Sequence, residues 1–509
     1  MTVQLTRLEN SADAGVVPLA PLWRRGVGGV ALGFVVLEVA LSARYGFHRD
    51  ELYFLACARH LSWGYVDQPP FVPAAAWIAT HLFGTSPTAL RIFPALAGGA
   101  TVVVTALMAR ELGGHRKSQF LAALATATSP QVLAAFHLLS TAAFDMFCWA
   151  AICFLLLRLL RTGDQRLWSV VGLVVGFALL NKSNVLFLIA ALAVGLALAG
   201  RFRVLLSWWS LLGVIIAVLI WIPNIIWNAQ HDWAALSMLQ SLHRENSSIG
   251  ASIGFIPSQF VVVGPVLIVL WLAGLRDLLR WSVGKPLAIA YLVLLVLFTL
   301  GGAKPYYLAG MYFVLFASGG AWAERRLDNH HPAKGLGGWA LMMAAGGVAA
   351  LPLSLPLLPE SVLPTGSWEG NINKDLSATV GWENVVQQIA RVSKTLPATE
   401  RAHLVVFTGD YGAAGAVDLW GAQYGLPHAI SGHNTYWWWG PAGAQDGATT
   451  IAIDLPRSYL LTVFANVTPA GSVQTPGNVW TEERGDPIWI CRGQRETWLQ
   501  AWPAARHYG

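Results

Sequence analysis

Charged residues are scarce in this chain of 509 residues. Lys, Arg, Asp and Glu make up 12% of it and hydrophobic residues 55%, whereas about a quarter of a soluble domain is charged. A soluble protein of this length could not bury so much apolar surface, so we expect lipid to be its solvent. The formal charge of +6 comes from basic residues that are scattered and form no basic stripe. We therefore expect no nucleic-acid partner.

Cysteine is also scarce. The four cysteines are Cys57, Cys148, Cys153 and Cys491. No pair has the spacing of metal ligands, and no disulfide framework is visible. Cys148 and Cys153 lie in an apolar run and are expected to be small core residues. A Cys57–Cys491 disulfide remains the alternative to two free thiols.

Nucleotide-binding motifs are missing as well. The segment 408–416 is rich in glycine and follows a predicted strand, and such a strand-to-helix turn can bind anions. It lacks the GxGxxG spacing and a Walker lysine. The sequence therefore predicts no nucleotide cofactor.

Long apolar runs dominate the first 360 residues. Eleven of them approach the about 20 residues that a transmembrane helix needs. They are 26–45, 88–110, 118–136, 140–160, 167–181, 184–200, 204–222, 258–279, 286–301, 305–322 and 337–357. The first follows Arg24 and Arg25 and has no small-residue cleavage site behind it, so we interpret it as a retained span.

The connections between these runs predict the orientation. Every second connection is basic and should be cytoplasmic by the positive-inside rule. These connections are Arg110–Lys117, Arg158–Arg166, Arg201–Arg203, Arg276–Lys285 and Arg325–Lys334. The tail 1–25 is then cytoplasmic, and the loops 46–87 and 223–257 face outward. An odd number of spans also places the C-terminal part outside a plasma (inner) membrane.

Two regions outside the spans should be folded. The spacing of apolar residues over Glu51–Leu61 and 71–83 predicts helices that lie along the membrane surface. From about residue 360 the apolar runs shorten, which predicts an extracytoplasmic α/β domain over 359–509, after a transmembrane domain over 26–358. In it we expect a helix over 382–395 and strands over 402–408, 450–454 and 459–465.

Ionisable residues gather at the predicted outer face. Inside a membrane such groups are costly and need a reason. They are Asp50, Glu51, Asp67, Asp145, Lys182 and Lys304. Each one alone could be a helix cap, a turn residue or a snorkelling anchor. Their shared location favours a functional site, because independent structural charges have no reason to choose one end of the bundle.

Two motifs in the first outer loop resemble a known family. His48–Tyr53 (HRDELY) and Gly64–Pro70 (GYVDQPP) are similar to the first outer loop of the polyprenyl-phosphate-dependent glycosyltransferases of GT-C fold, in particular the protein O-mannosyltransferase and aminoarabinose transferase group (glycosyltransferase family 39). Asn181-Lys182 and Lys304–Tyr307 (KPYY) resemble later landmarks, and the resemblance covers roughly 26–325. It implies a polytopic α-helical membrane protein with about eleven transmembrane helices, surface helices in the first outer loop and a small C-terminal α/β domain.

The resemblance also implies a reaction. A sugar on a polyprenyl-phosphate donor passes to an extracytoplasmic glycan, glycolipid or protein. One carboxylate takes the proton of the acceptor, and attack opposite the phosphate inverts the anomeric centre, as in inverting glycosidases. A cation then stabilises the departing phosphate, either a basic side chain or a divalent metal such as Mg, Mn or Zn.

We assign roles on this basis. Asp50 is the predicted general base and Glu51 its support, and Asp67 is the predicted metal or second-shell carboxylate. Asp145 should orient the acceptor or the sugar hydroxyls. Lys304 is the first choice as phosphate partner, followed by Lys182, His243 and Arg244. The remaining predicted substrate-binding residues are His48, Arg49, Tyr53, Gln68, Tyr306 and Tyr307.

Two departures and three alternatives stay open. Relatives often carry a basic residue where this chain has Tyr53 and Gln68, which leaves the sugar undetermined. A transporter or flippase of lipid-linked sugars would need inverted repeats and charges at the midplane, which are not visible. A noncatalytic membrane scaffold would give no reason for the acidic residues at the predicted outer face. The aromatic segment 431–441 could contact a sugar or pack against the bilayer or the bundle.

Overall fold

The computed structural model describes residues 19–246, 249–330, 334–360, 363 and 374–508. Contacts divide the chain into two compact units. The first comprises Met1–Ala40, Arg91–Ile226 and Glu245–Ser354, and the second Leu41–Leu90, Trp227–Arg244 and Leu355–Gly509. The first outer loop thus belongs to the same unit as the C-terminal region. The predicted bounds 26–358 and 359–509 stay a prediction, and most of the predicted tail 1–25 lies outside the described residues.

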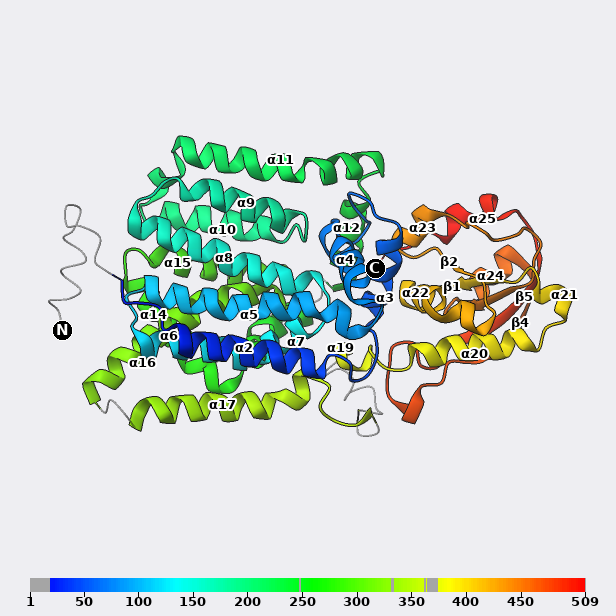
Figure 1. Cartoon of the computed structure of the whole chain (residues 1–509). Coiled ribbons are helices and arrows are strands. Elements are labelled where there is room, and N and C mark those ends of the chain that lie inside the picture. The colour runs from blue at the N-terminus through cyan, green and yellow to red at the C-terminus, as the bar shows by residue number, and fades with distance from the viewer. Residues whose placement is uncertain (1–18, 247–248, 331–333, 361–362, 364–373, 509) are drawn as a thin grey trace. The chain divides into compact units, whose positions relative to one another are not determined.

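The first unit is built from helices, several of which run alongside one another in Figure 1. Its helices are α2 (Arg24–Leu41), α5 (Pro87–Glu111), α6 (Arg116–Thr128), α7 (Pro130–His137), α8 (Thr141–Thr162), α9 (Leu167–Leu179), α10 (Val185–Leu198), η1 (Phe202–Leu205), α11 (Trp208–Gln230), α13 (Ile249–Val263), η2 (Pro265–Leu267), α14 (Ile268–Arg280), α15 (Lys285–Leu300), η3 (Pro305–Met311), α16 (Tyr312–His330) and α17 (Lys334–Ser354).

Several of these helices can cross a membrane. Within the described residues, α5, α8, α11 and the Gly335–Ser354 part of α17 are long and apolar enough. On α11, apolar side chains such as Leu211, Val214 and Leu219 are exposed, as expected of a helix face that contacts lipid. The number of eleven spans stays a prediction, because α9, α10 and α15 are apolar but shorter.

The predicted span 258–279 is wrong as one continuous helix. The chain bends by 90° between Ser252–Val263 and Pro265–Arg280. Gly264 has a φ of 90°, which glycine tolerates, and Pro265 cannot donate a backbone hydrogen bond. The predicted span 118–136 is likewise divided before Pro130 into α6 and α7.

Glycine allows close packing inside the first unit. Helices α14 and α16 pack against each other, and a Cβ on Gly274 would lie 2.1 Å from the carbonyl oxygen of Leu315. A Cβ on Gly319 would lie 2.2 Å from the carbonyl oxygen of Leu270. Small residues at such contacts let two backbones approach, as is common between membrane helices.

The second unit combines helices with a sheet. Its elements are α3 (Arg49–Arg59), α4 (Phe71–Phe83), α12 (Ala234–Asn246), α19 (Lys374–Ser377), α20 (Trp382–Lys394), α21 (Ala398–Arg401), β1 (Val405–Thr408), α22 (Tyr411–Trp420), η5 (Gly421–Tyr424), β2 (Ala429–Ser431), α23 (Thr435–Trp439), β3 (Thr450–Ile453), α24 (Arg457–Val463), β4 (Phe464–Ser472), η6 (Pro476–Asn478), β5 (Pro487–Gln494) and α25 (Trp498–Ala505). Helices α3 and α4 confirm the two helices predicted in the first outer loop.

The five-stranded sheet has the order β2-β1-β3-β5-β4. Strand β1 pairs in parallel with β2 and β3, and β5 pairs antiparallel with β3 and β4. Helix α20 packs against α22 and β3, while α24 and α25 share a core with β1 that includes Phe407, Leu460 and Trp498. These elements form the yellow-to-red part of Figure 1.

The sequence predicted this part well, with one error. The strands over 402–408 and 450–454 and the helix over 382–395 are confirmed by β1, β3 and α20. The predicted strand 459–465 is wrong, because the chain forms α24 and enters β4 only at Phe464. Leu460 and Val463 are both buried in the core, which is the i, i+3 spacing of a helix. Cys57 and Cys491 are buried and free, so the alternative of a disulfide between them is excluded.

Candidate functional site

The N-terminus of α3 holds the first predicted carboxylates. The imidazole of His48 accepts a hydrogen bond from the backbone N–H of Asp50 at 3.1 Å. Glu51 Oε2 accepts one from the backbone N–H of His48 at 2.9 Å, which completes a capping box. Glu51 is fully buried. It therefore fixes the start of the helix, in agreement with the supporting role predicted for it.

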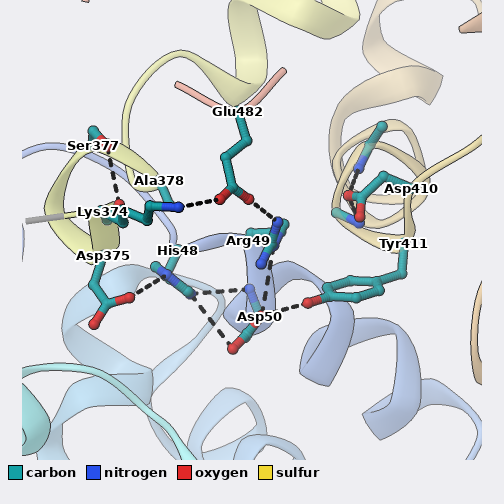
Figure 2. Close-up of polar contacts among 12 residues, drawn as sticks. His48, Arg49, Asp50, Lys374, Asp375, Ser377, Ala378, Asp410, Tyr411 and Glu482 are labelled. Carbon is teal, nitrogen blue, oxygen red and sulfur yellow. Dashed lines mark hydrogen bonds and ion pairs between the residues drawn. The ribbon is translucent and has the colours of Figure 1, made fainter. Parts of the chain in front are cut away.

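Asp50 points to a different environment, shown in Figure 2. Its Oδ1 accepts a hydrogen bond of 2.8 Å from the hydroxyl of Tyr411, the first residue of α22. Arg49 Nε lies 3.8 Å from the same oxygen, and 38% of the Asp50 side chain is exposed. The carboxylate is thus oriented by the protein and still accessible to a substrate.

Arg49 is engaged by the C-terminal region. Its Nη1 donates a hydrogen bond of 2.7 Å to Glu482, whose second oxygen lies 3.5 Å from Lys374 Nζ. The guanidinium carbon lies 5.4 Å from the centre of the Tyr411 ring. Figure 2 shows Arg49 between Glu482 and Asp50. The main contact of Arg49 is therefore structural, and its predicted role in substrate binding stays a prediction.

The second predicted carboxylate, Asp67, is also held by a tyrosine. The hydroxyl of Tyr53 donates to Asp67 Oδ1 at 2.7 Å and lies 2.6 Å from Thr435 Oγ1. The ring of Tyr53 packs 4.8 Å from the ring of Tyr411. Asp50 and Asp67 are thus linked through two tyrosines, of which the sequence predicted only Tyr53.

The environment of Asp67 disfavours its charge. The residue as a whole is exposed, but nearby protein atoms desolvate the carboxylate and raise its pKa to about 6, although the hydrogen bond from Tyr53 acts to lower this pKa. The neighbouring Gln68 is 4% exposed. Neither polar atom of its side-chain amide makes a hydrogen bond within the described residues. Buried polar groups usually have partners, so this amide is available to a ligand.

Replacing Asp67 by Asn should change how stability depends on pH. The folded pKa of about 6 lies above the unfolded value of about 3.9, so ionisation of Asp67 opposes folding. The penalty is absent below about pH 4 and complete above about pH 6. The melting temperature of Asp67→Asn relative to wild type should therefore rise between pH 4 and pH 6.5 and stay level above that. A difference that is constant from pH 4 to pH 8 would contradict this environment.

The glycine-rich turn 408–416 does not offer an anion site. Asp410 caps α22, and its Oδ1 accepts hydrogen bonds from the backbone N–H groups of Gly412 and Ala413 at 2.5 and 3.3 Å. The expected anion position is thus filled by the chain's own carboxylate. The glycines serve packing against α3 instead. A Cβ on Gly415 would lie 2.8 Å from the backbone of Leu52.

Sequence reasoning missed the contribution of the C-terminal region. Tyr411, Thr435 and Glu482 contact α3 and its loop from positions between 361 and 433 residues away. Local patterns carry no information on such contacts. The one signal was the glycine spacing after β1, which is typical of close helix packing as well as of anion binding.

Replacing Tyr411 by Phe tests whether its hydroxyl positions Asp50. The ring and its packing remain, while the hydrogen bond to the carboxylate is lost. Hydrogen bonds to charged groups contribute about 1.5–3 kcal/mol, so kcat for the reaction in which Asp50 is the predicted base should fall roughly tenfold or more, with KM and melting temperature little changed. The kinetics of the purified variant measure this. A kcat within twofold of wild type would show that Asp50 needs no such positioning.

A second group of predicted residues lies in the first unit. Asn184 donates to Asp145 Oδ2 at 3.1 Å. Lys182 Nζ lies 4.7 Å from the ring centre of Tyr307 and 5.4 Å from that of Tyr306. The structure thus brings together residues from α8, the turn before α10 and η3, as the sequence predicted.

Three predicted phosphate partners remain, namely Lys304, Arg244 and His243. Lys304 precedes η3 and is exposed. Arg244 Nε donates to the backbone carbonyl of Gln240 on its own helix α12, and the side chain of His243 lies outside the described residues. No group of three or more His, Cys, Asp or Glu residues in the described part of the chain is placed to hold a metal. The metal predicted at Asp67 stays a prediction.

The aromatic segment 431–441 packs within the second unit. The indole N–H of Trp437 donates to the carbonyl of Trp502, and that of Trp502 to the carbonyl of Trp437. Trp439 stacks on His60 at 4.5 Å, and Tyr436 donates to Asp418 at 2.7 Å. Most of these aromatic side chains are therefore occupied by contacts inside the protein.

Part of the chain is similar in sequence to known proteins. Residues 67–227 match the family model of the dolichyl-phosphate-mannose-protein mannosyltransferases. The lipid A galacturonosyltransferase RgtD of Rhizobium johnstonii is 27% identical over 244 residues, which are 47% of this chain and 51% of that protein. The match thus spans about half the length of the curated relative.

Two solved structures share the fold. ArnT from Cupriavidus metallidurans bound to undecaprenyl phosphate gives a TM-score of 0.61 at 14% identity, over 92% of this chain and 98% of that one. Its apo state gives 0.59 at 13%, over 92% and 97%. The chain therefore shares the GT-C fold of these structures, and its resemblance to the GT-C glycosyltransferases is confirmed.

Proposed function

We propose that the protein is an integral-membrane glycosyltransferase that moves a sugar from a polyprenyl-phosphate donor to an acceptor at the extracytoplasmic face. The observation that carries the proposal is the Asp50 carboxylate. It is accessible, lies in the first turn of α3 and accepts a hydrogen bond from Tyr411. The GT-C fold and the match to mannosyltransferases support this reading.

Asp50 acts as the general base. A helix N-terminus stabilises negative charge, which suits the position of the Asp50 carboxylate in the first turn of α3. The acceptor hydroxyl loses its proton to Asp50 while its oxygen attacks the anomeric carbon. The bond between this carbon and the phosphate oxygen breaks in the same displacement, and the configuration inverts. Glu51 and Tyr411 act through Asp50 by holding the start of α3 and the carboxylate.

Asp67, Tyr53 and Gln68 bind substrate in this proposal. The pair of Asp67 and Tyr53 offers a charged acceptor, and the buried amide of Gln68 offers both a donor and an acceptor. Sugar hydroxyls need both a hydrogen-bond donor and a hydrogen-bond acceptor. If a divalent cation is required, Asp67 is the residue that would contribute to holding it, and the cation would stabilise the phosphate charge.

Lys182 is the proposed phosphate partner in the first unit. Its ammonium group rests on Tyr306 and Tyr307, which limits its motion, and Asp145 with Asn184 can receive sugar or acceptor hydroxyls. A fixed cation stabilises the charge that develops on a departing phosphate. Lys304, which was the first choice from sequence, is exposed and becomes the second candidate.

The proposed partners and location follow from the same reading. The donor is a polyprenyl-phosphate sugar in a plasma (inner) membrane that the chain crosses several times. The acceptor is a glycan, a glycolipid or a protein, presented to an extracytoplasmic C-terminal domain. The curated relative acts on lipid A by its name, which favours a glycolipid as the first acceptor to test.

Reconstitution tests this function against transport. Proteoliposomes receive a polyprenyl-phosphate sugar labelled in both the sugar and the lipid, with a lipid A acceptor outside. The proposal predicts that the sugar label moves to the acceptor while the lipid label stays in polyprenyl phosphate. If the doubly labelled lipid crosses the bilayer intact and no sugar is transferred, the protein is a flippase.

A further inference from the structure

A cavity lies at one edge of the C-terminal sheet. It has a volume of about 410 Å³, within the range of about 300–1,000 Å³ that small-molecule sites span. Its lining comes from the residues that directly follow three strands, namely Gly409 and Asp410 after β1, His433 after β2 and Asp454 after β3, together with Tyr459 and the segment 504–507.

This edge is where ligands bind in open α/β sheets. Strands β2 and β3 pair in parallel with β1 on its two sides. The chain therefore passes from β1 to β2 on one side of β1, and then from β2 to β3 on the other side. Ligands of such sheets bind outside the carboxyl ends of the strands, where the strand order reverses. The position of the cavity therefore indicates a binding site rather than a packing defect.

Three polar groups of the lining have no polar partner. Within the described residues, no hydrogen bond or ion pair is found for the side chain of Asp454 or the hydroxyl of Tyr459, which are both half-buried, or for the guanidinium of Arg506, which is exposed. Arg506 is held by aromatic rings instead, at 4.9 Å from the centre of Trp437 and 5.6 Å from that of Tyr508. Asp454 has a φ of 56°, a conformation that is uncommon outside glycine and Asn or Asp.

The charges exclude several classes of ligand. Burial alone would raise the pKa of Asp410, but the hydrogen bond to His433 and the charge of Arg49 hold it below its usual range. A phosphate would meet this ionised carboxylate and the carboxyl group of Asp454, whose pKa is raised to about 6 by burial and by the charge of Asp410. An apolar ligand would leave the carboxylate and the guanidinium unpaired at a high cost. The described residues also provide no group of metal ligands.

We propose that this cavity binds a neutral carbohydrate. Asp454 accepts hydrogen bonds from the sugar hydroxyls, and Tyr459 and Arg506 donate to its oxygens. Sugar hydroxyls are donors and acceptors at once, which matches the mixture of unpartnered groups, and the ring of Tyr459 offers an apolar surface to the sugar face. The inference does not depend on the transferase proposal, because Asp50 is not among the residues that line the cavity.

Saturation-transfer NMR on the full chain tests the site. The protein is held in a detergent without a sugar headgroup and titrated with methyl glycosides of mannose, galactose and glucose. At least one of them should bind to wild type, and Asp454→Asn should weaken the binding about tenfold. Tyr459→Phe, which keeps the ring, should weaken it less. Melting temperatures identify any variant that is not folded.

Matched controls locate the binding. Glu496→Gln changes an exposed carboxylate of the same region that does not line the cavity, and it should bind as wild type does. Asp50→Asn should also bind normally. The inference is overturned if none of the three glycosides binds to wild type, if Asp454→Asn and Tyr459→Phe both bind as wild type does, or if Asp50→Asn loses binding to the same extent.

Discussion

Asp50→Asn should lower kcat for sugar transfer by about 10²–10⁴-fold, the usual contribution of a general base. Asn fills nearly the same space and can still accept the hydrogen bond from Tyr411 through its Oδ1, so the start of α3 should remain intact. It cannot take the proton of the acceptor. The loss should therefore appear in kcat, with the melting temperature and the affinity for the donor lipid close to those of wild type.

Asp375→Asn is the matched control for this variant. Asp375 lies near the same helix N-terminus, with its Oδ1 4.0 Å from His48 Nε2, and 75% of its side chain is exposed. The substitution Asp375→Asn changes the local charge by the same amount as Asp50→Asn. If the two variants lose activity equally, the loss reflects the electrostatic field and not proton transfer. Full activity of Asp50→Asn would remove Asp50 as the base.

Gly415→Ala should lower the stability of the protein. The added Cβ would lie 2.8 Å from the backbone carbon and oxygen of Leu52, and a backbone cannot move aside as a flexible side chain can. Overpacking of this kind costs about 1–3 kcal/mol. Helix α22 would have to retreat from α3, and Tyr411 on the same helix would then move from Asp50. Melting temperature and activity should therefore fall together.

Gly33→Ala provides the comparison. Gly33 lies in α2, and a Cβ there would meet no atom within 4 Å, so the exchange should be neutral or slightly stabilising, as Ala favours the helix. Both variants are measured by thermal unfolding in the same detergent. A melting temperature of Gly415→Ala equal to that of Gly33→Ala would mean that α22 does not pack closely on α3.

The first outer loop was predicted well because its signals are local. Apolar spacing and the prolines before residue 71 are sufficient to place α3 and α4. The turn that joins Asn181 to Lys182 and the segment Lys304–Tyr307 were likewise marked by short motifs, but the contact of Lys182 with the rings of Tyr306 and Tyr307 is a finding of the structure.

The features that the sequence could not predict depend on contacts between distant residues or on an interrupted helical periodicity. Tyr411 and Thr435 reach the first outer loop across more than 360 residues, and no local pattern points there. The bend at Gly264-Pro265 was present as a glycine-proline pair, but the apolar run on both sides concealed it. In 459–465, β-branched and aromatic residues favoured a strand, while burial of Leu460 and Val463 on one face favoured the helix.

We propose that Asp50 is a general base in a single displacement. The most direct test is the anomeric configuration of the first transferred product, determined by NMR before any further conversion. A single displacement gives inversion relative to the polyprenyl-phosphate donor. Retention of configuration would require a covalent sugar intermediate on the enzyme, and would contradict the role of Asp50 as a base.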